Sequence, residues 1–185
     1  VFSCGYNNYG QLGNGNTTNQ TEPVQVIQAY FITAIHAGYD HSLFLTKSGE
    51  VYSCGYNNYG QLGDGTGSTR NLPVQVKLSE KIKLIRCTGH RSSFFLSETN
   101  NVYSCGYNGH GQLGDKTTTN RNIPVKVMND YDVIDIETGY DHIMFTTSTN
   151  EIYACGYNAS YHLGDGTATN RNTPVRVFDS YLVKK

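Results

Sequence analysis

Residues 51–63 read VYSCGYNNYGQLG, and this phrase decides the fold because the chain contains four copies of it. The other copies are VFSCGYNNYGQLG (1–13), VYSCGYNGHGQLG (102–114) and IYACGYNASYHLG (152–164). A polar loop and a Pro-Val-x-Val step follow each copy, at 23–26, 73–76, 124–127 and 174–177. Self-similarity at a period of about 50 residues indicates a repeat protein whose units pack on their neighbours.

Each unit contains short segments rich in Val, Ile, Phe, Tyr and Thr that are bounded by Gly, Asn, Asp and Pro. This composition is typical of strands and turns, and no segment has helical periodicity over a useful length. We predict four strands per unit, for example at about 32–37, 41–46, 50–54 and 74–78. Pro73 then stands at the start of the fourth strand, where no ladder donor is needed. The pattern predicts an all-β fold, a β-propeller built of four-stranded antiparallel blades.

The longest form of the motif is GEVYSCGYNNYGQLGDG (49–65), with Pro-Val-x-Val after it and GYDHSLFL (38–45) before it. It resembles the repeat of the RCC1 (regulator of chromosome condensation) family, and the resemblance covers essentially all 185 residues. That family usually has Trp where this chain has Cys, so we expect smaller inner packing at Cys4, Cys54, Cys105 and Cys155. The resemblance implies a seven-bladed ring, of which this chain supplies about three and a half blades.

The repeat boundaries divide the chain into a partial propeller. We predict a half blade at 1–31, full blades at 32–82, 83–131 and 132–181, and the start of a further strand at 182–185. We therefore expect the remaining blades of the same protein to lie outside this sequence.

Composition excludes several classes of protein. With 14 Lys+Arg and 15 Asp+Glu the net charge is −1, so nucleic acid and anionic membranes are not predicted partners. No apolar run approaches the roughly 18 residues that span a bilayer. The five cysteines are odd in number and lack C-x-x-C spacing, which favours buried thiols in a reducing compartment, cytoplasmic or nuclear, over disulfides or zinc. No catalytic, cofactor or metal motif is present, so we predict neither an enzyme nor a cofactor.

Two repeated polar patterns favour structural roles. His41 and His142 lie in Gly-Tyr-Asp-His, and their repetition favours a hydrogen bond to the backbone over catalysis, with Asp40 and Asp141 as turn residues. An Asp also precedes an Arg by six residues in three units, which favours ion pairs within each blade over a row of Arg that grips an acidic partner. These pairs are Asp64–Arg70, Asp115–Arg121 and Asp165–Arg171.

Loop residues are the candidates for partner binding. Each repeated Cys-Gly is followed by a Tyr, which either packs between blades or forms a recognition surface, because Tyr offers a large contact area with few torsions. Residues that break the repeat are stronger recognition candidates than those that follow it. The predicted set is Tyr56, Arg70, His90, Arg91, Tyr107, His110, Lys116, Arg121, Tyr157, Tyr161, His162 and Arg171.

Two functions remain open from the sequence. The first is a non-enzymatic scaffold that binds proteins through the blade loops. The second, implied by the resemblance, is guanine-nucleotide exchange on a small GTPase. Exchange factors of that family carry a wedge-like insertion in one blade, whereas these units recur at 50–51 residues without one. A chromatin or lipid adaptor is disfavoured by the near-zero net charge.

Overall fold

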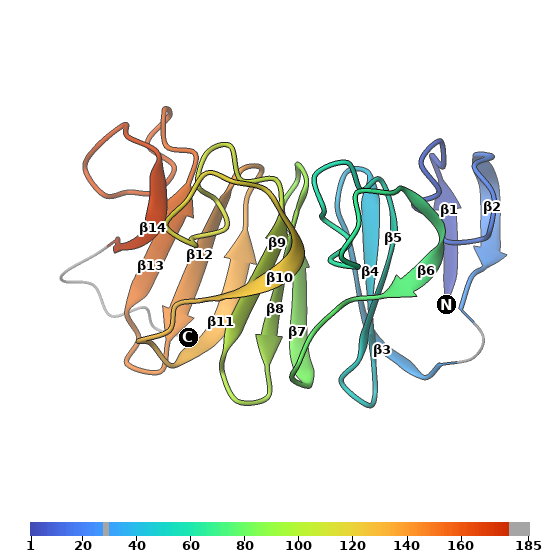
Figure 1. The fold of residues 1–185 in the computed structure, drawn as a ribbon, viewed down its shortest axis with the longest axis horizontal. Coiled ribbons are helices and arrows are strands. Elements are labelled where there is room, and N and C mark those ends of the chain that lie inside the picture. Colours follow the sequence, from blue (N-terminus) through green and yellow to red (C-terminus); the bar gives the residue numbers. More distant parts are fainter. Residues whose placement is uncertain (28–29, 178–185) are drawn as a thin grey trace.

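The computed structural model describes residues 1–27 and 30–177, and within them it consists of strands, turns and loops (Figure 1). The expected further strand at 182–185 lies outside the described residues. The strands are β1 (Phe2–Gly5), β2 (Gln20–Gln25), β3 (Ile32–Ala37), β4 (His41–Thr46), β5 (Val51–Gly55), β6 (Arg70–Gln75), β7 (Ile82–Cys87), β8 (Ser92–Ser97), β9 (Val102–Gly106), β10 (Arg121–Val127), β11 (Val133–Thr138), β12 (His142–Thr147), β13 (Ile152–Gly156) and β14 (Arg171–Arg176).

These strands form three four-stranded antiparallel sheets and one two-stranded sheet, β1–β2. In each four-stranded sheet the strands follow chain order, β3 to β6, β7 to β10 and β11 to β14. The sheets stand side by side across the molecule (Figure 1). The first strands contact one another, β3 with β7 and β7 with β11, so they lie innermost and β6, β10 and β14 form the outer edge. This is the blade arrangement that the repeat predicts.

The core lies between neighbouring sheets. Phe94 packs with Val133, Ile136 and other residues of the β11–β14 sheet, whereas the adjacent Phe95 packs with residues of the β3–β6 sheet such as Leu43. Successive side chains of a strand point to opposite faces, so one Phe-Phe pair serves two boundaries. Full burial of each ring contributes about 1.5–3 kcal/mol. A single blade therefore cannot bury its own core.

The fourth strand differs from its predicted position of 74–78. It runs from Arg70 to Gln75, and Pro73 lies inside it, where the pairing with β5 is irregular between Gly55↔Arg70 and Ser53↔Val74. An edge strand tolerates Pro because it needs no donor toward solvent. The polar Arg70–Asn71 pair resembles a loop in the sequence, which is why the predicted start was four residues late.

The repeated cysteines are small core residues, as predicted, in the three blades that follow another sheet. Cys54, Cys105 and Cys155 are fully buried, and the Cys54 thiol lies 3.4 Å from the carbonyl oxygen of Gln11 in the preceding unit. Burial raises the pKa of Cys54 to about 12, so its thiol stays protonated. Cys4 is exposed, because no described sheet precedes β1.

Each blade boundary is also closed by a reciprocal pair of hydrogen bonds. Gly15 N donates to Asn71 O at 2.9 Å, and Asn71 Nδ2 donates back to Gly15 O at 2.9 Å. The same exchange joins Gly65 to Asn122 and Lys116 to Asn172. Lys116 adopts φ +67°, the left-handed conformation that Gly15 and Gly65 hold at this position.

Candidate protein-interaction face

One end of the blades carries the turns and the long loops (Figure 1). These segments contain all predicted site residues except Arg70, Arg121 and Arg171, which begin the outer strands β6, β10 and β14. We call this end the loop face. It comprises the short turns between the first two strands of each sheet and the long loops between the last two. Its segments are 6–19, 38–40, 56–69, 88–91, 107–120, 139–141 and 157–170.

A buried Asn organises each long loop. Asn57 Nδ2 donates at 3.1 Å to Asp64 Oδ1, Thr66 O and Ser68 O, and its Oδ1 accepts from Leu62 N at 2.9 Å. Asn7, Asn108 and Asn158 make corresponding sets of bonds. Because one side chain satisfies three loop groups and a turn donor, the long loops are held as rigid frames.

The ion pairs predicted within each blade are present, with N···O distances of 2.9 Å for Arg70–Asp64 and 2.7 Å for the other two. Partial burial opposes ionisation of Asp165, but hydrogen bonds from Arg171 and Thr167 outweigh it and lower its pKa to about 2. Each Arg is about one-third exposed and its charge is already balanced. The three guanidinium groups therefore stabilise their loops and leave little net charge for a partner.

An aromatic row crosses the loop face from one blade to the next. Ring centroids are 5.0 Å apart for Tyr9–Tyr56, 5.2 Å for Tyr59–Tyr107 and 5.1 Å for His110–Tyr157, and each of these pairs spans a blade boundary. Distances of 5.7–6.3 Å join the rings within each loop. We define the aromatic row as Tyr6, Tyr9, Tyr56, Tyr59, Tyr107, His110, Tyr157 and His162.

Arg91 lies against this row at the first boundary between four-stranded sheets. Its guanidinium carbon is 4.7 Å from the centroid of Tyr56 and 5.2 Å from that of Tyr59, which is cation–π geometry. Its terminal nitrogens donate to the Tyr59 hydroxyl at 3.3 Å and to Asp40 Oδ2 at 3.4 Å. A carboxylate and two aromatic rings thus enclose one cation.

Asp40, Arg91 and Asp141 occupy the same position in successive units, so the charges alternate along the face. Asp40 accepts from Arg91, and Asp141 accepts from His90 at 3.2 Å across the next boundary. Both acids lie in the turns where the sequence predicts them, and the structure adds these contacts across the blade boundaries. His90 and Arg91 replace the Tyr-Asp of the other units. As a result His90 lies beside Asp141 of the following unit, and Arg91 lies beside Asp40 of the preceding unit.

The prediction of a backbone hydrogen bond for the repeated histidines was wrong. His41 is fully buried, and its Nε2 lies 2.9 Å from Ser93 Oγ in the neighbouring sheet. Burial lowers the pKa of His41 to about 3, so the ring is neutral at physiological pH. His142 instead stacks on His162, with centroids 5.0 Å apart and an interplanar angle of 9°.

The structure divides the predicted site residues into three groups. The first meets in or beside the aromatic row, the second forms the ion pairs of the loop frames, and the third is exposed and separate. Comparison of the units did not select Asp40 and Asp141 for the site, although the change from Tyr-Asp to His-Arg was the available signal. It also missed Gln112, whose Nε2 donates to Asp141 Oδ1 at 3.2 Å. The residues in or beside the aromatic row are Tyr56, His90, Arg91, Tyr107, His110, Tyr157 and His162. The ion pairs contain Arg70, Arg121 and Arg171, and the exposed, separate residues are Lys116 and Tyr161.

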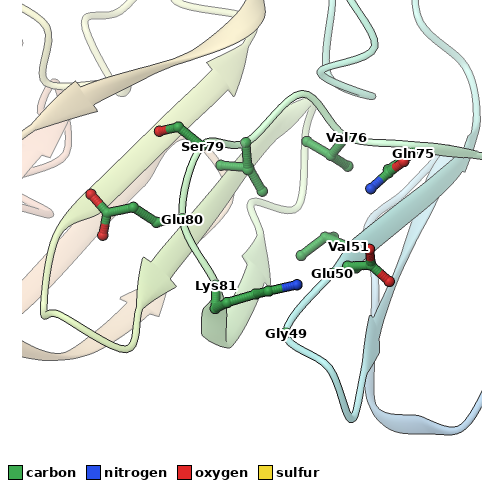
Figure 2. Close-up of a pocket in the computed structure, with 9 residues that line it drawn as sticks. Gly49, Glu50, Val51, Gln75, Val76, Ser79, Glu80 and Lys81 are labelled. Carbon is green, nitrogen blue, oxygen red and sulfur yellow. The ribbon is translucent and has the colours of Figure 1, made fainter.

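The opposite end of the blades carries a pocket of about 250 Å³ between the β4–β5 turn and the β6–β7 connection (Figure 2). Glu80 points away from Val51 and Lys81 in this view. Hydrogen bonds from Thr99 and Tyr103 lower the pKa of Glu80 to about 2, so its carboxylate is engaged by the β7–β10 sheet. None of the predicted site residues lines this pocket.

Residues 1–27 and 30–177 contain neither a candidate metal site nor a membrane-spanning helix. These residues include no group of three or more His, Cys, Asp or Glu side chains placed to hold a metal ion. They also include no helix that could cross a membrane.

Known proteins share this sequence pattern. The ultraviolet-B receptor UVR8 of Arabidopsis thaliana is 33% identical over 127 residues, which cover 67% of this chain and 29% of the receptor. The probable E3 ubiquitin-protein ligase HERC4 of Rattus norvegicus is 36% identical over 135 residues, which cover 71% of this chain and 13% of the ligase. The chain therefore spans less than a third of the length of these relatives.

Solved structures share the fold. The crystal structure of human WBSCR16 matches 97% of this chain with a TM-score of 0.86 at 24% identity, and the chain spans 48% of it. The structure of Kap60 bound to yeast RCC1 (Prp20) matches 97% of the chain with a TM-score of 0.84 at 22% identity, and the chain spans 45% of that protein. The all-β partial propeller is thus confirmed. A family model described as the RCC1-like domain matches residues 1–184, and the chain belongs to this RCC1-like family.

Proposed function

We propose that this chain is part of a non-enzymatic scaffold that binds a protein partner through the loop face. The observation that carries the proposal is the aromatic row, which continues across three blade boundaries on loops held by buried Asn side chains. Aromatic rings on a fixed frame offer contact area at a small entropic cost, and this is how rigid recognition surfaces gain affinity.

The electrostatics of the face support a selective contact. The Arg of each long loop is paired with its own Asp, and Arg91 is paired with Asp40. A partner therefore meets Tyr and His rings together with internally balanced charges. Such a surface suits a mixed polar and aromatic protein interface better than the phosphate backbone of a nucleic acid.

Family membership supports a protein partner. Among proteins with this fold, yeast RCC1 has been solved with Kap60 bound, and Prp20p of Saccharomyces cerevisiae has binding properties toward Gsp1p and histones. We extend only the use of the fold for protein binding to this chain. We further propose the blade boundaries 1–31, 32–82, 83–131 and 132–181 within a larger ring, and a reducing compartment in which the five free cysteines persist.

A comparison of partner capture by full-length variants tests the scaffold proposal. Tyr59→Leu and Tyr107→Leu remove rings from the row, and Tyr131→Leu removes a ring at the opposite end that packs on Tyr153. We expect either loop-face variant to weaken capture about tenfold or more, as for a central aromatic contact, and Tyr131→Leu to leave it unchanged.

Two outcomes would contradict the scaffold proposal. One is equal capture by all three variants with unchanged melting temperatures. The other is accelerated release of labelled nucleotide from a purified small GTPase in the presence of the full-length protein, which would favour exchange.

A further inference from the structure

A pocket of about 410 Å³ opens on the outer wall of the molecule, between the outer strands β10 and β14. One side comprises residues 114–116, part of β10 and the start of the β10–β11 connection, and the other side comprises Thr173 and Pro174 of β14. We call it the outer-wall pocket. Both of its sides belong to described sheets, and its volume lies within the range of about 300–1,000 Å³ that is usual for ligand pockets.

At the preceding blade boundary a lysine side chain occupies the equivalent space. An added Cβ on Gly65 would lie 2.5 Å from Lys77 Nζ and 3.4 Å from Lys77 Cδ, so this side chain lies directly over the glycine. Lys77 N also donates to Gly63 O at 2.9 Å, which holds the start of the β6–β7 connection against the end of the turn. At that boundary the unit therefore covers this part of the outer wall with its own residue.

Two residues of the next unit remove this cover. Met128 follows the Pro-Val-x-Val step as Lys77 does, but it adopts φ +56° and its side chain packs in the core between the last two sheets. Lys116 replaces Gly65 and adopts φ +67°. Residues with a side chain rarely adopt a left-handed backbone, and two of the five that do so in the described chain line this pocket. The opening thus arises from the residues of this unit, at a boundary whose two sheets are both described.

The floor of the outer-wall pocket is apolar. Val125, Val127, Met128 and Pro174 contribute to it. Val127 and Met128 also belong to the buried core cluster between the two sheets, so their positions are fixed by packing. A methionine side chain adapts to varied partners because it is flexible and polarizable. An apolar side chain of a partner therefore finds a surface here on which to bury area.

Two lysines of the lining have no partner for their charge. Lys116 and Lys126 are exposed, and neither ammonium group has a hydrogen bond or an ion pair to a described residue. Arg121 is paired with Asp115 at 2.7 Å, so this pair adds no net charge. Asp130 is the remaining carboxylate of the lining, and two lysines against one carboxylate leave a net charge of +1. Because the whole chain has a net charge of −1, this pocket is a local site of charge complementarity for an acidic group.

We propose that the outer-wall pocket binds an acidic side chain of a protein partner together with a neighbouring apolar side chain. The carboxylate pairs with the ammonium groups of Lys116 and Lys126, and the apolar side chain packs on Val125 and Pro174. This contact is separate from the aromatic row. It goes beyond the proposed function, because it gives the scaffold a second binding site of different chemistry.

Methyl NMR of the full-length protein tests the pocket, because Met128 lines it whereas Met144 of β12 packs in a different cluster. The two signals are assigned by Met128→Leu and Met144→Leu. The probe is the peptide N-acetyl-Leu-Glu-Leu amide, and N-acetyl-Leu-Gln-Leu amide is its neutral match. We expect the acidic probe to shift the Met128 signal saturably, to leave the Met144 signal unchanged and to bind about two- to fivefold more tightly than the neutral probe, as for exposed ion pairs.

Variants of the two lysines test the charge. Lys116→Gly restores the residue that Gly65 represents in the preceding unit, so it removes a charge and keeps the left-handed turn. Lys126→Gln removes the other charge. Each variant should weaken binding of the acidic probe about two- to fivefold and leave binding of the neutral probe unchanged. Lys77→Gln removes an exposed lysine at the preceding boundary and is the matched control, which should bind both probes as the wild-type protein does.

Several results would overturn the outer-wall pocket. These are equal binding of the two peptides, acidic-probe binding that is unchanged in both lysine variants, and the absence of a Met128 shift with either peptide. An equal Met128 shift with sodium acetate at the same concentration would also overturn it, in favour of a site for free carboxylates. Tyr107→Leu should leave peptide binding unchanged, so failure of the outer-wall pocket is measured separately from failure of the loop-face scaffold.

Discussion

Single side chains set the conformation of the loop face, and the buried Asn of each long loop is the most heavily used. We expect Asn108→Ala to destabilise the protein by about 2–4 kcal/mol, because it leaves several buried groups of the 107–120 loop unsatisfied at once. Urea unfolding of the variant measures this change. Asn58→Ala, at an exposed position of the equivalent loop, is the control and should change stability by less than about 0.5 kcal/mol.

Cysteine at the repeated family position is matched to the distance between sheets. An added Cβ on Gly63 would lie 3.1 Å from the Cys105 sulfur, so no space remains there for a larger side chain. We expect Cys105→Trp, which introduces the residue usual in the family, to cost at least about 1–3 kcal/mol through overpacking. Cys4→Trp in this 185-residue chain should have little effect, since Cys4 is exposed. Equal melting temperatures for both variants would contradict the expectation.

Buried His41 should make the protein sensitive to mild acid. The unfolded chain binds the proton near pH 6.5, but folded His41 binds it only near pH 3. Between these values the unfolded state binds more protons than the folded state. The free energy of unfolding is therefore undiminished by His41 above pH 6.5 and falls as the pH is lowered toward 3. The slope approaches about 1.4 kcal/mol per pH unit for this one group. Urea unfolding from about pH 7.5 to about pH 5 measures it.

His41→Gln is the matched variant for this pH dependence, because it retains a polar group near Ser93 but does not titrate. The acid slope should decrease in this variant. A residual slope is expected, since His36 and His142 also have lowered pKa values and act in the same direction. An unchanged slope would show that His41 is not the responsible group.

At the scale of elements, β8 joins two cores through adjacent rings. Phe95→Ala should loosen the boundary with the β3–β6 sheet, and Phe94→Ala the boundary with the β11–β14 sheet. Each change should cost about 3–5 kcal/mol. Hydrogen exchange distinguishes them, because faster exchange should concentrate in the sheet that each ring faces. The two variants serve as controls for each other, and an identical exchange pattern would argue against separate boundaries.

The elements also show how far the sequence could be interpreted without coordinates. Strands β3 and β4 were predicted at their observed bounds because apolar residues and flanking turn residues define them. The start of β6 was not, because Arg70 and Asn71 belong to a strand through their pairing at the edge and not through their composition. Local composition thus predicts the apolar strands β3 and β4 better than the polar outer strand β6.

The same limit applies to the candidate site. Tyr56, Tyr107 and the repeat-breaking His90 and Arg91 could be selected from sequence, but their partners could not. The contacts of Arg91 with Asp40 and of His41 with Ser93 join residues 51 and 52 positions apart. Such contacts depend on how two blades are aligned, and the repeat alone does not specify this alignment.

At the scale of the whole molecule, the reactivity of the exposed Cys4 thiol can test whether a further blade packs against β1. Cys54, Cys105 and Cys155 are each covered by the preceding unit, and in a larger propeller a preceding blade would cover Cys4 in the same way. We expect Cys4 to react rapidly with maleimide in the 185-residue chain and as slowly as Cys105 in the full-length protein, as measured by mass spectrometry after labelling. Rapid labelling of Cys4 in both proteins would contradict the proposed ring.

The reciprocal bonds between Gly15 and Asn71, and between their counterparts, have a consequence for how such a protein evolves. Each unit closes its long loop with its own residues and offers its neighbour the same pair of groups at every boundary. A gene segment of one period can therefore be duplicated or exchanged without redesign of the units on either side. A residue that departs from the repeat, such as Arg91, can then change one boundary while the others keep the repeated contacts.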